Sequence, residues 1–141
     1  MSWQAHIDNM MSHQQNEGHC AICGVNDGGI WAASPGCPLT QAEAANLASF
    51  VRANGVGGDK QYTFGGIALM IVRNYEDGGV TYYQLVTKNS DARPIRDDEK
   101  GLVAVAKSAQ ALVIGYVPGA NQKKANASVE YEVKYLLSQG Y

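Results

Sequence analysis

The sequence predicts an α+β fold: a central antiparallel sheet, largely a meander, with the N- and C-terminal helices packed together on one face and a further helix on the other. Two observations predict it. Apolar residues recur with helical spacing near both chain ends and once between them, and elsewhere short β-branched runs alternate with Gly, Asn and Asp. With 141 residues, of which 45% are hydrophobic, the chain can bury one core, so we expect one domain over residues 1–141.

The N-terminal part is predicted to be a helix followed by a hairpin. Ser2 can cap a helix that ends before residue 17. The apolar side of this helix consists of Trp3, Ile7, Met10 and Met11. Residues 20–25 and 30–33 are then two strands, because the Asn-Asp-Gly-Gly segment between them accepts the positive φ of a tight turn.

The rest of the chain is predicted to be a helix, a meander and a last helix. Thr40 and Glu43 have the spacing of a capping box, which starts a helix over residues 41–54. Five runs rich in β-formers follow, at residues 62–64, 67–73, 80–88, 101–107 and 111–117. Pro118 ends the last strand, and the chain to residue 139 is helical. The inward stripe of this helix consists of Ala125, Val129, Val133, Leu136 and Leu137.

The three cysteines are the one cluster that suggests metal or redox chemistry. Cys20 and Cys23 form a CxxC pair, and Cys37 follows. The pair lies in a predicted strand, where residues three apart point to opposite faces, so the two sulfurs are poorly placed for one ion or one disulfide. A thioredoxin-like pair would instead begin a helix, which lowers the thiol pKa. We therefore expect cysteines that pack as small hydrophobes, with no metal and no cofactor.

Composition argues against some partners and locations. The formal net charge of -2 provides no basis for a nucleic-acid partner. Residues 1–51 carry four acidic and no basic side chains, whereas the remainder carries eleven basic and nine acidic ones. This uneven distribution fits a protein with two surfaces of different charge; the alternative is that it has no functional consequence. The chain has no apolar run of about 20 residues and begins without a basic, apolar leader, so we expect a cytoplasmic protein.

Motifs for catalysis are absent from the sequence. It contains no GxxxxGK[ST], no GxSxG and no HExxH, so we expect a protein that is not an enzyme. The glycine-rich residues 55–60 resemble a phosphate loop only superficially, because no strand directly precedes them and no helix follows. We expect a surface loop there.

Aromatic residues at the two chain ends are the most informative feature. Trp3 stands in the first turn of the first helix, and Tyr135 and Tyr141 stand in and after the last turns of the last helix. If these helices pack side by side, the rings form an exposed patch that Trp31 can join from the hairpin. Polyproline II segments dock on such rings, and the indole N–H and phenol O–H can donate to their unpaired carbonyls. The alternative is that the four rings fill gaps in the core.

Segments along nearly the whole chain resemble the profilin family. They are residues 2–4 and 7–11, the tryptophan-bearing 30–34, the glycine pair 65–66 followed by 70–73, Lys88, and residues 107–115 and 135–141. No single segment is specific. Because they occur in the family's order and at its usual length, the chain is identified as a member of that family.

The resemblance implies three sets of binding residues. The polyproline site consists of Trp3, His6, Asn9, Trp31, Tyr135, Leu136 and Tyr141. The actin surface consists of Met70, Ile71, Val72, Arg73, Lys88, Asn126 and Glu130. The phosphoinositide site consists of Arg73, Lys88, Lys123, Lys124 and Lys134. His6 stands where the family usually has tyrosine; an imidazole can still stack and donate a hydrogen bond.

The implied function is that of a cytoskeletal protein that binds actin monomers and regulates actin polymerisation. Its other implied partners are proline-rich proteins, such as filament nucleators and elongators, and phosphoinositide headgroups at the membrane surface. One alternative is an adaptor that mainly binds phosphoinositides or proline motifs and has weak actin affinity. Another is a profilin-like metal or redox protein that uses Cys20 and Cys23.

Overall fold

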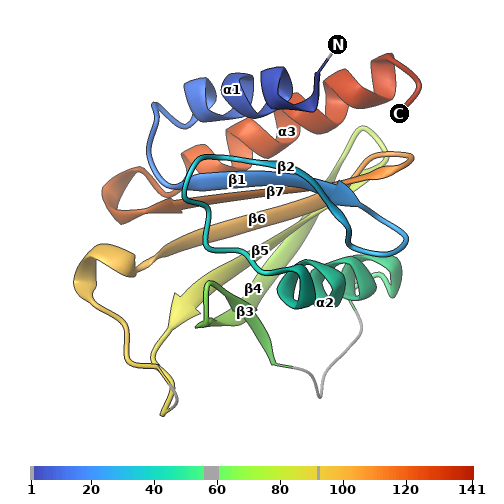
Figure 1. Cartoon of the computed structure of the whole chain (residues 1–141). Coiled ribbons are helices and arrows are strands. Elements are labelled where there is room, and N and C mark those ends of the chain that lie inside the picture. The colour runs from blue at the N-terminus through green and yellow to red at the C-terminus, as the bar shows by residue number, and fades with distance from the viewer. Residues whose placement is uncertain (1, 56–60, 92) are drawn as a thin grey trace.

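The computed structural model describes residues 2–55, 61–91 and 93–141, which form three helices and seven strands (Figure 1). In chain order these are α1 (Trp3–His13), β1 (His19–Gly24), β2 (Ile30–Ala33), α2 (Gln41–Arg52), β3 (Tyr62–Phe64), β4 (Ile67–Asp77), β5 (Val80–Lys88), β6 (Gly101–Lys107), β7 (Ala111–Pro118) and α3 (Lys124–Ser138). Short 3-10 turns at Asp97–Glu99 and Gly119–Asn121 flank β6 and β7. Of the predicted loop at residues 55–60, all but Gly55 lies outside the described residues.

The seven strands form one antiparallel sheet in the order β2-β1-β7-β6-β5-β4-β3. The strands from β3 to β7 are the predicted meander. The N-terminal hairpin joins it through β1, which pairs with β7 from His19↔Tyr116 to Gly24↔Ala111. The predicted fold class is confirmed.

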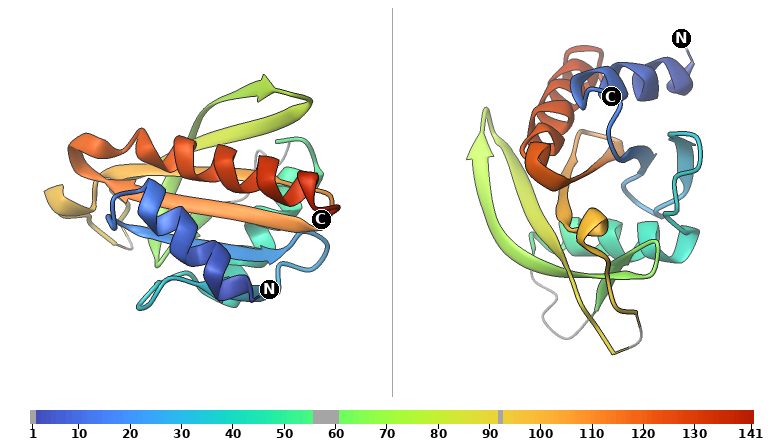
Figure 2. Two further views of the ribbon diagram at one scale, coloured as in Figure 1. Left: turned by 90° about the horizontal axis from the view of Figure 1, so that it is seen from above. Right: turned by 90° about the vertical axis from the view of Figure 1, so that its left-hand side faces the viewer.

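The helices cover the two faces of the sheet as predicted. α1 and α3 lie side by side on one face, and α2 lies on the other (Figure 2). Alternation along β1 shows how one strand serves both cores: Cys20 and Ile22 pack toward α1 and α3, whereas Ala21 and Cys23 pack toward α2. Both cysteines are fully buried on opposite faces, and burial raises the pKa of each thiol to about 12, so they pack as apolar residues.

Glu43 fixes α2 to the turn between β3 and β4. It completes the predicted capping box with Thr40 and also accepts hydrogen bonds from the Thr63 hydroxyl, at 2.6 Å, and from the N–H groups of Gly65 and Gly66, both at 2.9 Å. Burial by itself would raise the pKa of this carboxyl, but these donors together hold the pKa below its usual range.

Two details differ from the predictions. β4 continues to Asp77 and does not end at residue 73, because its polar end pairs with β5 through the Gly78–Gly79 turn. Leu137 is 41% exposed, although it was predicted to face inward. The buried positions of α3 centre on Ala125, Val129 and Leu136, and Leu137 lies about 100° away from that centre around the helix.

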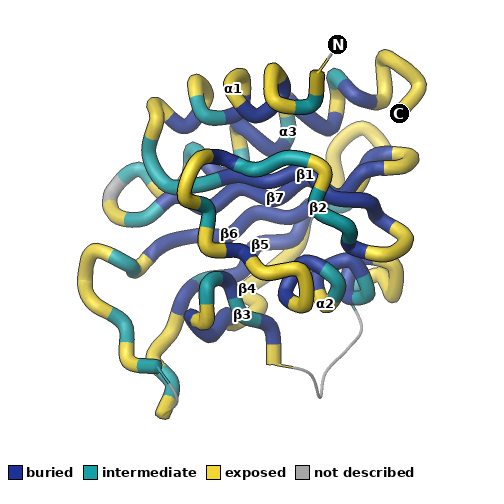
Figure 3. Tube along the Cα trace, viewed as in Figure 1, coloured by how far each residue is buried: buried dark blue, intermediate teal, exposed yellow. Residues whose placement is uncertain are grey.

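Burial along the chain separates the scaffold from its accessible parts (Figure 3). The central strands β1, β6 and β7 are almost entirely buried, whereas the outer sides of α1 and α3 and most of β4 after Leu69 are exposed. Within the described residues, no helix is long and apolar enough to cross a membrane, and no three His, Cys, Asp or Glu side chains gather as metal ligands would.

Candidate functional site

Five rings from both chain ends and from β2 meet where α1 and α3 lie together. We call this set the aromatic surface: Trp3, His6, Trp31, Tyr135 and Tyr141. The ring centroid of Trp3 is 4.9 Å from that of Trp31, 5.2 Å from that of His6 and 5.6 Å from that of Tyr141. His6 is in turn 5.5 Å from Tyr135. The rings therefore form one contiguous group, with Trp3 at its centre.

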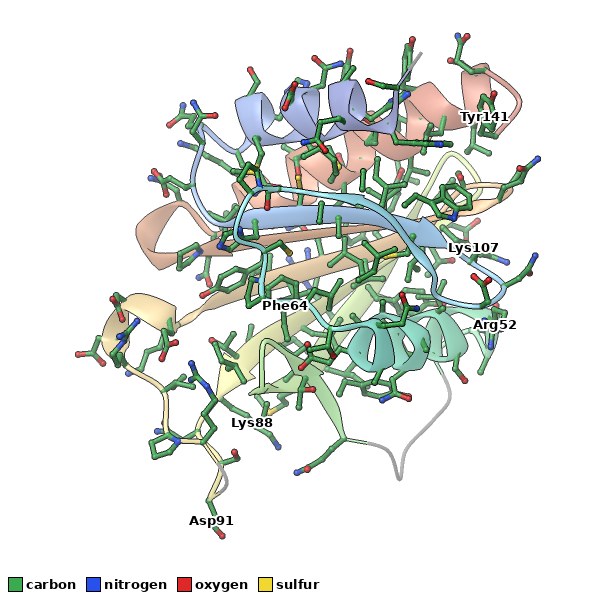
Figure 4. The ribbon with its side chains drawn as sticks, viewed as in Figure 1. Arg52, Phe64, Lys88, Asp91, Lys107 and Tyr141 are labelled. Carbon is green, nitrogen blue, oxygen red and sulfur yellow. The ribbon has the colours of Figure 1, made fainter. Side chains whose placement is uncertain are left out.

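Local contacts hold this group in place. Ser2 caps α1 by accepting a hydrogen bond from the N–H of Ala5, so the helix starts directly at Trp3. The last residue is also fixed, because the main-chain oxygen of Tyr141 accepts hydrogen bonds from the N–H of Gln110, at 2.6 Å, and the hydroxyl of Ser108, at 2.9 Å. Figure 4 shows Tyr141 beside the end of α3, next to the start of α1.

Polar atoms of the aromatic surface are available to a ligand. Within the described part of the chain, no hydrogen bond is donated by the indole N–H of Trp3 or Trp31 or by the hydroxyl of Tyr135 or Tyr141. A hollow of about 330 Å³ lies beside Trp3 and Tyr141, and His6 and Gln139 complete its lining. The surface thus combines apolar ring faces with free donors.

His6 and Leu136 lie under this surface more than on it. His6 is 6% exposed, and its Nδ1 lies 2.7 Å from Oε2 of Glu132, which is fully buried on α3. The other oxygen of Glu132 has no partner among the described residues. Burial raises the pKa of Glu132, against the lowering effect of His6 and His13.

Leu136 is fully buried in the core, so it supports the rings from below. Asn9 is exposed on α1, three residues from His6.

A second surface lies on the other side of α3, where β4 and β5 pass beside the helix (Figure 2). We call it the polar surface. A hollow of about 360 Å³ there is lined by Arg73, Asn74, Tyr75, Gln84, Asn126 and Glu130. Arg73, Asn126 and Glu130 were predicted for the actin site, and the fold brings these three together.

Four side chains of the polar surface form two hydrogen-bonded pairs, whereas the buried Oδ1 of Asn126 has no partner among the described residues. Nε of Arg73 donates to Oε1 of Gln84 at 2.6 Å, and the hydroxyl of Tyr75 donates to the carboxylate of Glu130. Burial, followed by this hydrogen bond, raises the pKa of Tyr75. Asn126 and Glu130 lie one turn apart on α3, so they present one face toward Arg73.

The other residues predicted for the actin site extend along the hairpin. Met70, Ile71 and Val72 are 49%, 43% and 52% exposed, next to a register shift in the pairing of β4 with β5. β3 pairs with β4 only from Ile67 to Leu69, so these three residues follow the paired part of that edge. Lys88 lies four residues beyond Gln84 on β5, and Figure 4 places it far from Tyr141.

The fold does not gather the five cations predicted to bind phosphoinositides. Arg73 and Lys88 lie on the hairpin, whereas Lys123, Lys124 and Lys134 lie at the start and in the middle of α3. Nζ of Lys134 lies 2.8 Å from the carboxylate of Asp77, and Lys124 donates to the side-chain oxygen of Gln15. Side chains of Lys88 and Lys123 have no ion-pair partner within the described residues.

Sequence reasoning missed Tyr75, Gln84 and Glu132. A signal for the first two was present in the Gly78–Gly79 turn, because a two-residue turn fixes Asp77 opposite Val80 and hence, further along the hairpin, Arg73 opposite Gln84. Glu132 had no such signal. Its role depends on how α1 and α3 are rotated against each other.

Comparisons with known proteins agree on one family. The family model described as Profilin matches residues 1–141. Profilin-1 of Entamoeba histolytica is 28% identical over 145 residues, which cover all of both chains, and Profilin-1 of Dictyostelium discoideum is 29% identical over the full length of both. Two solved structures have the same fold. Profilin IB of Acanthamoeba castellanii has a TM-score of 0.72 at 23% identity, with 99% of this chain and 100% of that chain covered. Mouse profilin IIa in complex with a double repeat from the FH1 domain of mDia1 has a TM-score of 0.70 at 24% identity, with 100% of both chains covered.

Proposed function

The chain belongs to the profilin family, a family of actin-binding proteins that are not enzymes, and from this premise we propose that it binds actin monomers and regulates their polymerisation while it holds proline-rich ligands. The observation that carries the proposal is the convergence of rings from three separate segments: the centroids of Trp31 and Tyr141 lie 4.9 Å and 5.6 Å from that of Trp3. We assign the proline-rich ligand to this aromatic surface and actin to the polar surface. The proposed location is the cytoplasm, at the actin cytoskeleton.

Ring faces and free donors of the aromatic surface suit a proline-rich segment. Such a segment is a polyproline II helix, whose carbonyls are not bonded within the helix and whose prolines have no N–H. Indole and phenol donors can therefore bond the ligand while the rings cover its apolar side. Mouse profilin IIa, which has the same fold, was solved in complex with a double repeat from the FH1 domain of mDia1, and this supports the assignment.

Retention on immobilised polyproline tests the proline site. The wild-type protein should be retained, and it should be released by denaturant but not by salt, because the surface is aromatic and has no fixed charge. Trp3→Ala should pass through the column. Ile71→Ala is the matched control, because it removes an exposed apolar side chain from β4 and leaves the aromatic surface intact. Equal retention of wild type and Trp3→Ala would contradict the proposal.

The polar surface is proposed to bind actin through β4, β5 and α3. Arg73, Asn126 and Glu130 line one hollow, and Met70, Ile71 and Val72 add exposed apolar area beside it. Exposed apolar residues bordered by charged and hydrogen-bonding groups are typical of a protein–protein interface. Sedimentation of actin filaments tests it: the wild-type protein should increase the unsedimented fraction of actin, and Arg73→Glu should not.

Phosphoinositide binding is the smaller part of the proposal, since two of the five predicted cations are engaged by Asp77 and Gln15. Lys88 and Lys123 are the cations best placed to meet lipid phosphates. Flotation with vesicles that contain phosphatidylinositol bisphosphate, at low and high salt, tests this part. Binding that is lost in the double variant Lys88→Ala, Lys123→Ala would support it.

A further inference from the structure

The row of rings on the outer side of α1 and α3 does not end at Tyr135. Tyr131 lies one turn earlier on α3; its ring is parallel to that of Tyr135 within 4°, and the two centroids are 6.4 Å apart. The ring of His13, at the end of α1, is 4.1 Å from that of Tyr131. Tyr131 is 44% exposed and His13 is also exposed, so the core does not account for either ring.

These two rings continue the aromatic surface along the two helices. α1 and α3 run in opposite directions side by side, so the end of α1 lies against an earlier part of α3 than its start does (Figure 2). His6, Asn9 and His13 are spaced by three and four residues and share one side of α1. Tyr131 and Tyr135 form the facing row on α3. The additional rings therefore follow the seam between the helices.

Dimensions of this row match an extended proline-rich chain. Polyproline II rises about 3.1 Å per residue, so the 6.4 Å between the rings of Tyr131 and Tyr135 corresponds to about two residues of ligand. Trp3 and His13 are ten residues apart on α1, which is about 15 Å along the helix axis or about five residues of polyproline II. The row is too long for a ligand that covers only Trp3 and its neighbours.

Chemistry of the row also favours a ligand of this kind. Within the described residues, the hydroxyl of Tyr131 donates no hydrogen bond, as is true of Tyr135. A row of free donors and ring faces complements a chain that is rich in carbonyls and poor in N–H groups. None of the rings carries a fixed charge. Lys124 donates to Gln15, two residues beyond His13 along the chain.

We propose that the ligand-binding surface continues along the seam of α1 and α3 to Tyr131 and His13, and that it takes proline-rich segments about five residues longer than the rings around Trp3 alone would hold. This inference rests on the proposed proline-binding function. It adds Tyr131 and His13 as residues that determine the preferred ligand length.

Calorimetric titration with proline peptides of about six and about twelve residues tests the extension. Tyr131→Ala should weaken binding of the longer peptide by about three- to tenfold and change that of the shorter one by less than about twofold. Leu137→Ala is the matched control, because it truncates a side chain on the same helix that is similarly exposed, at 41% against 44%, but lies outside the row. Tyr131→Phe should keep most of the affinity, since it keeps the ring.

Outcomes of this test separate the extension from the function on which it rests. A longer peptide also binds more tightly because it offers more registers, but that gain would survive in Tyr131→Ala. If Tyr131→Ala and His13→Ala leave both peptides unaffected while Trp3→Ala abolishes binding, the extension is wrong and the proline site stands. If no peptide binds the wild-type protein, both are wrong.

Discussion

The two sides of α3 carry surfaces of opposite character. One side contributes Tyr131 and Tyr135 to a row of rings whose hydroxyls donate no hydrogen bond within the described residues. The other contributes Asn126 and Glu130 to a surface on which Glu130 accepts from Tyr75 and Arg73 donates to Gln84, while the buried Oδ1 of Asn126 has no partner among the described residues. A ligand on the aromatic surface thus gains hydrogen bonds without breaking any in the protein. A partner on the polar surface must replace pairs such as Arg73 with Gln84, which makes its affinity depend on charge and geometry. One helix can therefore serve two partners that are recognised by different physics.

Removal of the Trp3 ring should have the largest effect, and it should affect binding at the aromatic surface but not at the polar surface. Trp3→Ala should weaken binding of a proline-rich peptide by about thirtyfold or more, because Trp3 contacts three of the other four rings. Affinity for actin should stay within about twofold. Calorimetry measures the first and actin sedimentation the second, after circular dichroism has shown that the variant is folded. Parallel loss of both activities in a folded variant would mean that the surfaces are not independent.

The reciprocal change is a charge reversal on the polar surface. Arg73→Glu should weaken actin binding by about five- to a hundredfold, because it introduces repulsion with Glu130 and leaves Gln84 without its donor. Binding of the proline-rich peptide should be unchanged. Arg73→Lys keeps the charge and should lie between wild type and Arg73→Glu. An Arg73→Glu variant with wild-type actin affinity would exclude this face as the actin surface.

Ionic strength should distinguish the surfaces without any mutation. Between about 50 and 300 mM salt, affinity for actin should fall by about threefold or more, because screening weakens the charged contacts. Affinity for a proline-rich peptide should change by less than about twofold, since the rings carry no fixed charge. A steep salt dependence of peptide binding would show that charged groups outside the aromatic surface take part.

The smallest expected effect concerns the buried carboxyl beneath the rings. Because the pKa of Glu132 is raised in the folded protein, its contribution to stability is present below its unfolded pKa, near 4.5, and is lost as the pH rises through the folded value. The stability of wild type relative to Glu132→Gln should therefore fall as the pH rises from 4 to 7. Urea unfolding at several pH values measures this difference.

A second carboxyl provides the control with the opposite sign. Glu43 is held by four donors and its pKa is lowered, so its contribution is present above the unfolded pKa and is lost as the pH falls through the folded value. The stability of wild type relative to Glu43→Gln should therefore rise with pH over the acidic range. If the stability of wild type relative to each of the two Gln variants changed in the same direction with pH, the opposite pKa shifts assigned to Glu132 and Glu43 would be wrong.

Most of the fold could be predicted because helices and strands leave local periodic signals. The capping box at Thr40 even located the first residue of α2, Gln41. The pairing of β1 with β7 could not be derived from local pattern, since it joins segments about 90 residues apart. The length of β4 was underestimated because Asn74, Glu76 and Asp77 are poor β-formers, and pairing with β5 extends the strand in spite of them.

Site prediction from sequence shows the same division. Trp3, Trp31 and Tyr141 meet as expected, because packing of the terminal helices brings both chain ends together. His6 was expected at the surface, yet it is buried against Glu132. Whether a helical residue faces its neighbour or the solvent depends on helix rotation, which spacing within one helix does not determine.

The central claim is that the rings gathered around Trp3 form the binding site for proline-rich ligands. Intrinsic fluorescence tests it most directly, because the chain has two tryptophans, Trp3 and Trp31, and both belong to the aromatic surface. Titration with a proline-rich peptide should produce a saturable change in tryptophan emission, and Trp3→Ala should abolish it even though Trp31 remains. No saturable change in the wild-type protein, at peptide concentrations up to about 1 mM, would contradict the claim.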